Sequence, residues 1–525
     1  MTTSTARADN DLTLALLPLD ERPVNTRYPQ MLGAIAGATV RLPPADFRGL
    51  QRTPADTNAV AAWLRENAKG VDGIVAAAEY LLFGNLIASR ISDESAADVL
   101  PRLAVLEEAG AGGSVPVYAF GLITRVPNAN DCVEEPEYWR DWGTRFYRYS
   151  GLLHKREAGE LDADEADALL TLKAELPPDL VRDWLGRRLR NHAVSLILLD
   201  LLARGRLHFL LLTSDDTSAW GLPSREKTWL EGWPRLLGPS VQERLLIHPG
   251  ADEVGSALVA RLVSEKRNLR PSVFPLYAVP GGEEIIAPYE DRPVRITVEG
   301  QIRACGARLA ASPDEADIVL GVLTPSPRRT EWRADFADEE KRDRNEDYQA
   351  AFAVLGSLQA AGKPVALGDV AYPNGADPLA LELLLDPACP LDPSRLAAFG
   401  AWNTAGNTLG VVVAQAVCSL MTNDDPAREA AQARFLTHRF LEDWGYQTLV
   451  RRDARAHLTA RFGRHDPDPN DPAQIEAACA VIADGLGRVL ERLQARGVGT
   501  GLALVPGSVR LPWRRTFEVD FDLTP

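Results

Sequence analysis

Runs of apolar residues, each followed by a polar cluster, recur along the chain. The stretches 12–19, 73–78 and 207–212 are almost continuously hydrophobic, which is typical of strands covered by helices on both faces. Stretches such as 57–69 and 254–265 have the apolar spacing of helices. The alternation of the two patterns predicts an α/β protein with parallel strands.

The number of predicted strands favours one large barrel. Eight strands begin near residues 12, 39, 73, 115, 207, 245, 365 and 396, and eight strands close a (β/α)8-like barrel. We therefore predict a catalytic domain of this kind at 12–424, with an inserted α/β segment around 272–350. Two adjacent doubly wound α/β domains would produce the same alternation and remain the alternative.

Further predictions concern the segments around this barrel. Within 272–325, strands are expected at 273–279, 294–298 and 318–323, around a helix at 301–309, either as a separate unit or as later strands of the same sheet. The helical stretch 134–206 is too long for a simple crossover and is interpreted as an elaborated connection that could cover the site. Residues 425–525 are expected to be mainly helical and to end in a strand at 516–523 that pairs with the main body. Residues 1–11 are expected to be disordered.

Composition and charge narrow the choice of partners. The 525-residue chain has a formal net charge of −16, which disfavours nucleic acid and anionic membranes because both attract basic surfaces. Five scattered cysteines without CxxC spacing indicate reduced thiols. The polar N-terminus lacks the apolar core of a secretory signal, and no stretch is apolar for the ~20 residues of a membrane span. A cytoplasmic protein with a small-molecule substrate is expected, and the question of homo-oligomers stays open.

Two adjacent carboxylates follow the central hydrophobic run. Asp215 and Asp216 come directly after 207–212 and Thr213-Ser214, where the loop after a parallel strand meets ligands. Neighbouring carboxylates repel each other, so that one can hold a proton while the other stays ionised. We predict that they are the catalytic pair. The alternative is that one caps the following helix and the other is solvated.

Carboxylates, amides, arginines and aromatic residues follow the other predicted strands as well. This combination suits a sugar, whose hydroxyls bind polar groups while its C–H faces stack on rings, and glycoside hydrolysis needs two carboxyl groups. A glycoside hydrolase that acts on a small or oligomeric sugar, with retention favoured, is therefore predicted. The predicted substrate-binding residues are Asp20, Arg22, Asn25, Glu79, Asn85, Arg90, Arg125, Trp220, Asp252, Asp369, Tyr372, Asn374, Asp377, Trp402, Asn403 and Asn407.

Two other functions stay open. Asp20, His248, Asp252 and Asp369 would serve a metal-dependent hydrolase or lyase, but the chain has only seven histidines and no HxH, HExxH or CxxC spacing, so that neither a metal nor another cofactor is predicted. GxSxG and phosphate-loop motifs are also missing from the sequence. The non-enzymatic alternative is a carbohydrate-binding protein.

Several motifs together carry a family resemblance. They are LPLDERPVN at 17–25, AAEYLLFGNLIASR at 77–90, SDDTSAWGLPSREK at 214–227, PGADEVG at 249–255, DVAYPNGAD at 369–377, AWNTAGNTLG at 401–410 and the final PWRRTFEVDFD. With them the chain resembles the bacterial DUF4127 family over most of its length. This resemblance implies kinship but no function.

A second resemblance concerns mechanism. The order of FLLLTSDD, DVAYPNGAD and WNTAGN is similar to that of the Asp-Asp, Asp-Asn-Tyr-Pro-x-Asn and Trp-Asn segments of barrel β-N-acetylglucosaminidases. It implies an N-acetylhexosaminide substrate, whose acetamido group Asp215 would orient while Asp216 protonates the leaving oxygen. Asp369, Asn374, Trp402 and Asn403 would bind the sugar. The chain departs from that pattern in having Asp-Val-Ala-Tyr-Pro, without the Asn that holds the acetamido group.

Overall fold

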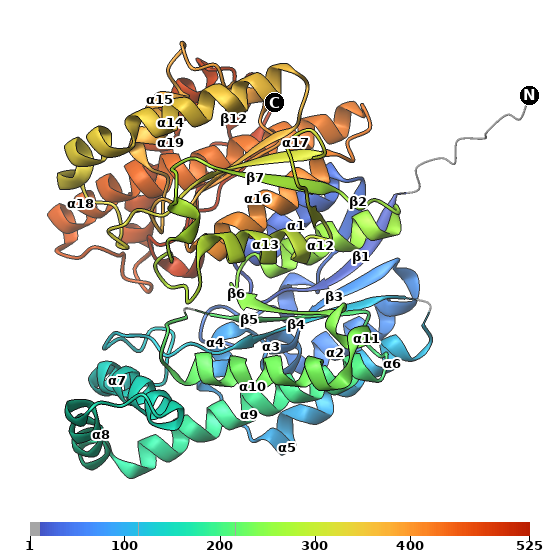
Figure 1. The fold of residues 1–525 in the computed structure, drawn as a ribbon, viewed down its shortest axis with the longest axis vertical. Helices are drawn as coiled ribbons and strands as arrows, with labels where there is room; N and C mark the ends of the chain where they lie inside the picture. Colours follow the sequence, from blue (N-terminus) through green and yellow to red (C-terminus); the bar gives the residue numbers. More distant parts are fainter. Residues whose placement is uncertain (1–10, 114, 216) are drawn as a thin grey trace, which may run out of the picture.

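The structure, a computed structural model, describes residues 11–113, 115–215 and 217–525 (Figure 1). The stretch 1–11, expected to be disordered, lies outside the described residues except for Asp11. Two parallel sheets form the body of the molecule, with helices between the sheets and over their outer faces (Figure 1). Among the described helices, none has both the length and the apolar character needed to cross a bilayer.

The first sheet has six parallel strands in the order β2-β1-β3-β4-β5-β6. The strands are β1 (Leu12–Leu17), β2 (Ala38–Arg41), β3 (Gly73–Ala77), β4 (Val117–Ile123), β5 (Phe209–Ser214) and β6 (Leu245–Pro249). They confirm the first six strands predicted from the apolar runs. Every residue of β3, β4 and β5 is buried, as expected for central strands of a sheet with helices on both faces.

The second sheet has five parallel strands in the order β11-β10-β9-β7-β8. The strands are β7 (Ser272–Tyr277), β8 (Arg308–Leu309), β9 (Ile318–Leu323), β10 (Val365–Asp369) and β11 (Ala398–Gly400). The segment expected as an insertion thus supplies β7, β8 and β9, which continue one sheet with β10 and β11.

Both sheets follow the same winding rule. Counted from its own first strand, each runs 2-1-3-4-5, and the first sheet adds a sixth strand; this is an order found in doubly wound α/β folds. The strands expected to form one barrel are divided between the two sheets, and a closed barrel is not shown by the pairings of the described residues. Two parallel sheets are the arrangement that the alternative prediction required.

A layer of helices separates the two sheets (Figure 1). It contains α1 (Pro23–Ile35), α12 (Val254–Lys266), α13 (Val294–Ala304) and α16 (Ala405–Ser419), with α12 packed on α16. Because α16 lies between two sheets, it is buried from Ala405 to Cys418 and its sequence is mostly apolar. A Cβ at Gly410 would lie 2.2 Å from Cγ of Glu253, so that glycine permits this close packing.

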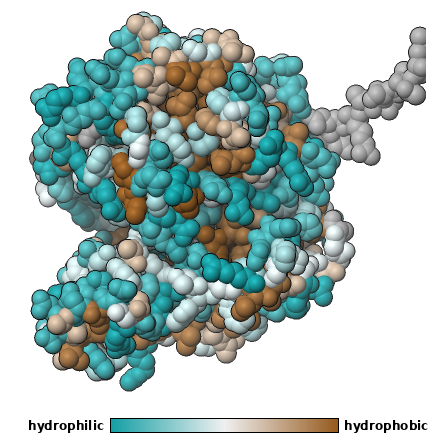
Figure 2. Space-filling view, in the orientation of Figure 1, coloured by the Kyte–Doolittle hydropathy of each residue, from teal (hydrophilic) through white to brown (hydrophobic). Residues whose placement is uncertain are grey.

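Other helices cover the outer faces. On the first sheet and around it lie α2 (Thr57–Asn67), α3 (Ala78–Phe83), α4 (Leu86–Ile91), α5 (Ala96–Val99), α6 (Ala104–Ala111), α9 (Pro178–Ala203), α10 (Leu222–Leu237) and α11 (Pro239–Gln242). On the second lie α14 (Ala337–Ala360) and α15 (Pro378–Leu384). The helices α7 (Trp139–Ala158) and α8 (Ala163–Glu175) form a lobe at the lower left of Figure 1, and Figure 2 shows a mostly hydrophilic surface whose outline narrows above this lobe.

The C-terminal region is mainly helical. It consists of α17 (Pro426–Arg439), a π-helical segment (Phe440–Val450), α18 (Arg451–Phe462), α19 (Pro472–Gln494), and the short strands β12 (Ala503–Leu504) and β13 (Leu523–Thr524). The strand predicted at 516–523 is wrong as a strand of the main body, because β13 pairs only with β12 among the described residues.

One predicted strand is a helix. The residues 294–298 belong to α13, whose buried positions include Val294, Thr297, Val298, Gln301 and Ile302. These positions follow the helical spacing i, i+3, i+4, i+7 and i+8. The β-branched residues favoured a strand, but their spacing fits one buried face of a helix.

Candidate functional site

A polar cavity of about 310 Å³ lies where the carboxyl ends of strands from both sheets come together. Parallel strands place their following loops at one edge, where ligands of doubly wound folds bind. The predicted site residues that line it are Arg22, Arg90, Arg125, Asp215, Asp252, Asn374, Asn403 and Asn407. Residues that were not predicted complete the lining: Leu86, Glu134, Ser214, Pro249, Gly250, Ala251, Tyr289, Glu290, Glu331, Thr404, Arg515 and Phe517.

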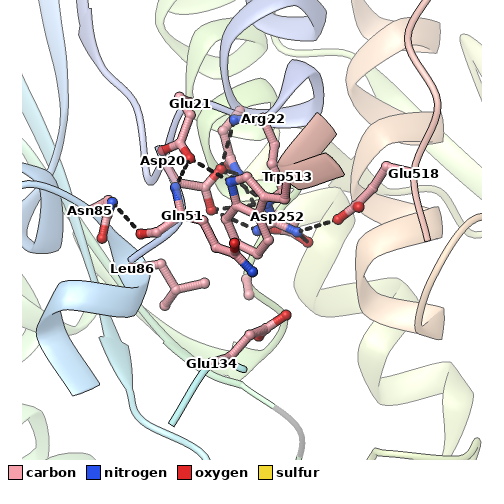
Figure 3. A network of polar contacts seen from close by, with 12 residues as sticks. Asp20, Glu21, Arg22, Gln51, Asn85, Leu86, Glu134, Asp252, Trp513 and Glu518 are labelled. Carbon is pink, nitrogen blue, oxygen red and sulfur yellow. Dashed lines mark hydrogen bonds and ion pairs between the residues drawn. The ribbon is translucent and has the colours of Figure 1, made fainter. Parts of the chain in front are cut away.

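Arg22 is the centre of a buried polar network (Figure 3). It lies just before Pro23, which begins α1 with its fixed φ. Its Nη2 is 2.7 Å from Asp20 Oδ2, and its Nη1 is 3.2 Å from Asp252 Oδ2. The guanidinium also lies 4.4 Å from the centre of the Trp513 ring. Arg22 therefore ties the loop after β1 to the loop after β6 and to the C-terminal segment.

Asp252 is a carboxylate of the cavity whose pKa is raised towards neutral pH. Burial raises its pKa to about 6. Arg22 opposes this shift, while the negative charges of Asp20 and Asp215 add to it. Asn25 donates to Asp252 Oδ1 at 3.2 Å and Asn403 donates to Oδ2 at 3.3 Å. A carboxyl group with such a pKa can release or accept a proton near neutral pH.

Asp215 has a different environment in the same cavity. Arg90, on α4, forms an ion pair with Asp215 and also binds Glu134, with Nη1 3.0 Å from Glu134 Oε2. Arg125 Nη2 is likewise 3.0 Å from Glu134 Oε2. The neighbouring Asp216, the other member of the predicted catalytic pair, lies outside the described residues.

Glu134 joins this network to the C-terminus. Its pKa is well below the usual range: burial would raise it, but Arg125, Arg515 and Arg90 outweigh that effect. Arg515 Nη1 is 2.5 Å from Glu134 Oε1, and its Nη2 is 2.8 Å from Glu518 Oε1. Ionised Glu134 thus holds three arginines from separate parts of the chain around the cavity.

The contribution of the C-terminal segment was missed by the sequence prediction. Trp513 has φ +53° and donates from Nε1 to Glu21, and Arg515 and Phe517 line the cavity. The dense aromatic and basic residues of PWRRTF were the available signal. The local pattern of such a segment does not indicate which distant strand it contacts.

Several predicted site residues hold the loops in place instead of lining the cavity. Asp20 and Asn25 lie behind it, where Asn25 Nδ2 is 3.0 Å from Asp20 Oδ1. Glu79 accepts the Leu122 backbone N–H at 2.7 Å, and burial raises its pKa to about 7. Asn85 caps α4 by accepting from Ala88 N.

The contacts described for the remaining predicted residues are contacts within the protein. Asp369 accepts the backbone N–H groups of Ala371 at 3.0 Å and Asp377 at 2.7 Å, and Asp377 caps α15. Tyr372 and Trp402 are buried outside the lining. These four residues lie outside the described lining of the cavity, and their binding of a sugar stays a prediction.

Trp220 also lies outside the described lining of the cavity. Its ring packs against His154 of α7, with centroids 5.0 Å apart, and the Nζ atom of Lys155 is 5.8 Å from its centre. Its place is beside the α7–α8 lobe, away from the cavity lining. The stretch 134–206, interpreted as a connection that could cover the site, contributes Glu134 to the described lining.

The four residues of the metal hypothesis do not form one group. His248 donates from Nδ1 to the Pro249 carbonyl at 2.7 Å, and burial lowers its pKa to about 4. Asp369 is held by its own loop. Within 11–113, 115–215 and 217–525, no cluster of three or more His, Cys, Asp or Glu side chains has a metal-binding arrangement.

Comparison with known proteins gives a family for this chain. Residues 14–522 match the family described as "Protein of unknown function (DUF4127)". The chain belongs to the DUF4127 family. No curated protein matches it. The DUF4127 motifs LPLDERPVN, PGADEVG and AWNTAGNTLG contain Arg22, Asp252 and Asn403, which meet at the cavity.

Proposed function

We propose that this DUF4127 protein is a glycoside hydrolase whose substrate occupies the cavity between the two sheets. The observation that carries the proposal is the presence of Asp252 and Asp215 in one cavity, with different environments. Burial raises the pKa of Asp252 to about 6 although Arg22 forms an ion pair with it, and Asp215 is ion-paired with Arg90. Glycoside hydrolysis uses such a division between a proton donor and an ionised carboxylate.

The proposal assigns different work to the two carboxyl groups. Asp252 donates its proton to the leaving glycosidic oxygen as the bond to the anomeric carbon breaks. Asp215, which forms an ion pair with Arg90, stabilises the positive charge that develops on the sugar and acts as the nucleophile or base. Asp216 remains the candidate acid from the sequence, and its variant belongs in the same test.

Amides and rings suit the binding of sugar hydroxyls and C–H faces. Asn374 and Asn403 have φ values of +60° and +65°, a conformation that asparagine tolerates better than most residues. The Asn374 backbone N–H donates to the Asn403 carbonyl at 3.0 Å, so that the loops after β10 and β11 support each other. Phe517 and Tyr289 add aromatic surface.

The cavity size indicates a small sugar unit. A volume of about 310 Å³ is at the lower end of the range for small-molecule sites. One saccharide unit, with the rest of an oligomer extending outward, fits that volume. The N-acetylhexosaminide substrate and the cytoplasmic location predicted from the sequence are kept as parts of this proposal.

Hydrolysis of a panel of aryl glycosides, with and without N-acetyl groups, tests the proposal. We expect the wild type to cleave at least one sugar, with the same rate after addition of a chelator, and Asp252→Asn and Asp215→Asn to lose this activity. Hydrolysis that the chelator abolishes would favour the metal-dependent alternative. Sugar binding without turnover by the wild type would favour the carbohydrate-binding alternative.

A further inference from the structure

A second, larger cavity adjoins the candidate site. Its volume is about 1000 Å³, and its walls come from α18, the loop after β10 and the stretch 331–334. Glu331 and Asn374 line both cavities, and Asn374 Nδ2 donates to Glu331 Oε1 at 2.9 Å. The two cavities are therefore neighbours that share a wall at Glu331 and Asn374.

The second cavity concentrates positive charge in an acidic protein. Arg333, Arg451, Arg452 and Arg455 line it together with His465, against the carboxylates Glu331 and Asp466. The whole chain has a net charge of −16. Arg451 and Arg455 are four residues apart on α18, a spacing at which like charges on a helix repel each other. An anion between them would relieve this repulsion.

The contacts of these arginines leave donors available. Arg455 Nε donates to Thr516 Oγ1 at 2.8 Å, but its Nη2 is 3.8 Å from Asp466. Arg451 Nη1 donates to Gln447 Oε1 at 2.9 Å, and Nε of Arg451 is buried without a hydrogen-bond partner among the described residues. Burial and the neighbouring Arg455 lower the pKa of Arg451.

Phe517 connects the basic cavity with the candidate site. Its ring lines the first cavity, and the guanidinium of Arg451 lies 5.0 Å from the ring centre. Arg515 lies 5.1 Å from the same ring centre. The Phe517 ring therefore lies between the first cavity and Arg451 of the basic cavity. The two cavities are close enough for one oligosaccharide to occupy both.

We propose that the basic cavity binds the oxyanion of an acidic oligosaccharide, either the carboxylate of a uronic acid or a phosphate ester, whose next sugar unit lies in the first cavity. The binding of a sugar unit in the first cavity rests on the proposed function. The binding of an anion in the second is inferred separately, from the arginines of α18. Planar guanidinium groups bind carboxylate and phosphate with paired hydrogen bonds.

Isothermal titration calorimetry with inorganic phosphate and with D-glucuronate tests the anion site directly. The wild type is expected to bind at least one probe, and the double variant Arg451→Gln/Arg452→Gln to bind it about tenfold or more weakly, since charged hydrogen bonds are lost. Arg461→Gln, on the same helix but outside the cavity lining, is the matched control and should bind as the wild type does. Arg452→Glu, a change at an exposed position, serves if the double variant does not fold.

The two probes distinguish the sources of the anion. Tighter binding of phosphate assigns the cavity to a phosphate ester, and tighter binding of glucuronate assigns it to a uronic acid; either result supports the proposal. No binding of either probe to the wild type, or equal binding by the substituted protein, would overturn it.

An activity measurement separates this proposal from the proposed function. For matched neutral and acidic aryl disaccharides, the wild type should show about tenfold higher kcat/KM with the acidic one. The double variant Arg451→Gln/Arg452→Gln should lose only this preference for the acidic disaccharide. If no glycoside is cleaved, the proposed function fails, while the titration still decides the anion site.

Discussion

The two sheets share a strand order, but the carboxylates at their strand ends have different hydrogen-bond partners. Asp252 follows β6 and accepts hydrogen bonds from Arg22, Asn25 and Asn403, which come from other elements. Asp369 ends β10 and accepts backbone N–H groups of its own loop, from 371 and 377. The pKa is raised by burial in both, to about 6 and about 7.

Because the pKa of both carboxyl groups is raised, this shift alone does not distinguish the two as candidates for catalysis. Asp369 lies outside the cavity lining, and its nearest carboxylate, Asp377, adds to the shift. Asp252 faces the cavity. A strand-end carboxylate is a candidate for catalysis where its partners leave it in contact with a ligand site, and it stabilises the loop where backbone donors surround it.

Substitution of Asp252 is expected to have the largest effect. If Asp252 is the proton donor, Asp252→Asn should lower kcat about 10²–10⁴-fold, the usual contribution of general acid catalysis. KM should change much less. Initial rates with the best aryl glycoside measure both values, and circular dichroism checks the fold. A variant with wild-type kcat would remove Asp252 from the chemistry.

The matched change at the second sheet should affect stability instead. Asp369→Ala leaves two buried backbone N–H groups without an acceptor, at a cost of about 2–4 kcal/mol in the free energy of unfolding. Urea denaturation measures this loss. The kcat per folded molecule should stay within about twofold of the wild type; a loss comparable to that of Asp252→Asn would contradict the separation of roles.

The pH dependence of stability should also depend on Asp369. Its folded pKa of about 7 lies above the unfolded value of 3.8, so that its stabilising contribution is present below about pH 4 and is lost as the pH rises through 7. In Asp369→Asn, the decrease in unfolding free energy between pH 4 and 8 should be smaller by roughly 4 kcal/mol, because the shift from 3.8 to about 7 spans about 3 pKa units of ~1.4 kcal/mol each. Equal pH dependence in both proteins would show that Asp369 does not titrate in this range.

The smallest effect is expected at Trp220. Because its ring packs against His154 and lies outside the lining, Trp220→Ala should change KM by less than about twofold. Phe517→Ala, which removes a ring from the cavity wall, is the contrasting variant and should raise KM several-fold. A larger effect at Trp220 than at Phe517 would contradict the assignment of the two rings.

The strands were the part of the fold that the sequence predicted well. Continuous apolar runs such as 73–78 and 207–212 became β3 and β5 because burial on both faces selects that composition. The division into two sheets was not predictable from the runs, since strand spacing does not state which strands pair. In α13, the β-branched residues Val294 and Val298 hid a helical period.

The candidate site was predicted only in part for a similar reason. Residues directly after strands, such as Arg22 and Asp252, were found because parallel strand ends meet at one edge. Glu134 and Arg515 were missed because they reach the cavity through contacts between distant segments. Asp369 has the same sequence signal as Asp252, and only its backbone partners distinguish the two.

The pH profile of kcat/KM for the wild type and Asp252→Asn, measured with the best aryl glycoside, tests the central claim most directly. A proton donor must be protonated to act, so that kcat/KM of the wild type should fall as the pH rises above about 6, the pKa of Asp252. The residual activity of the variant should lack this decrease. A decrease with the same midpoint in the variant would contradict the account and assign the proton transfer to another group.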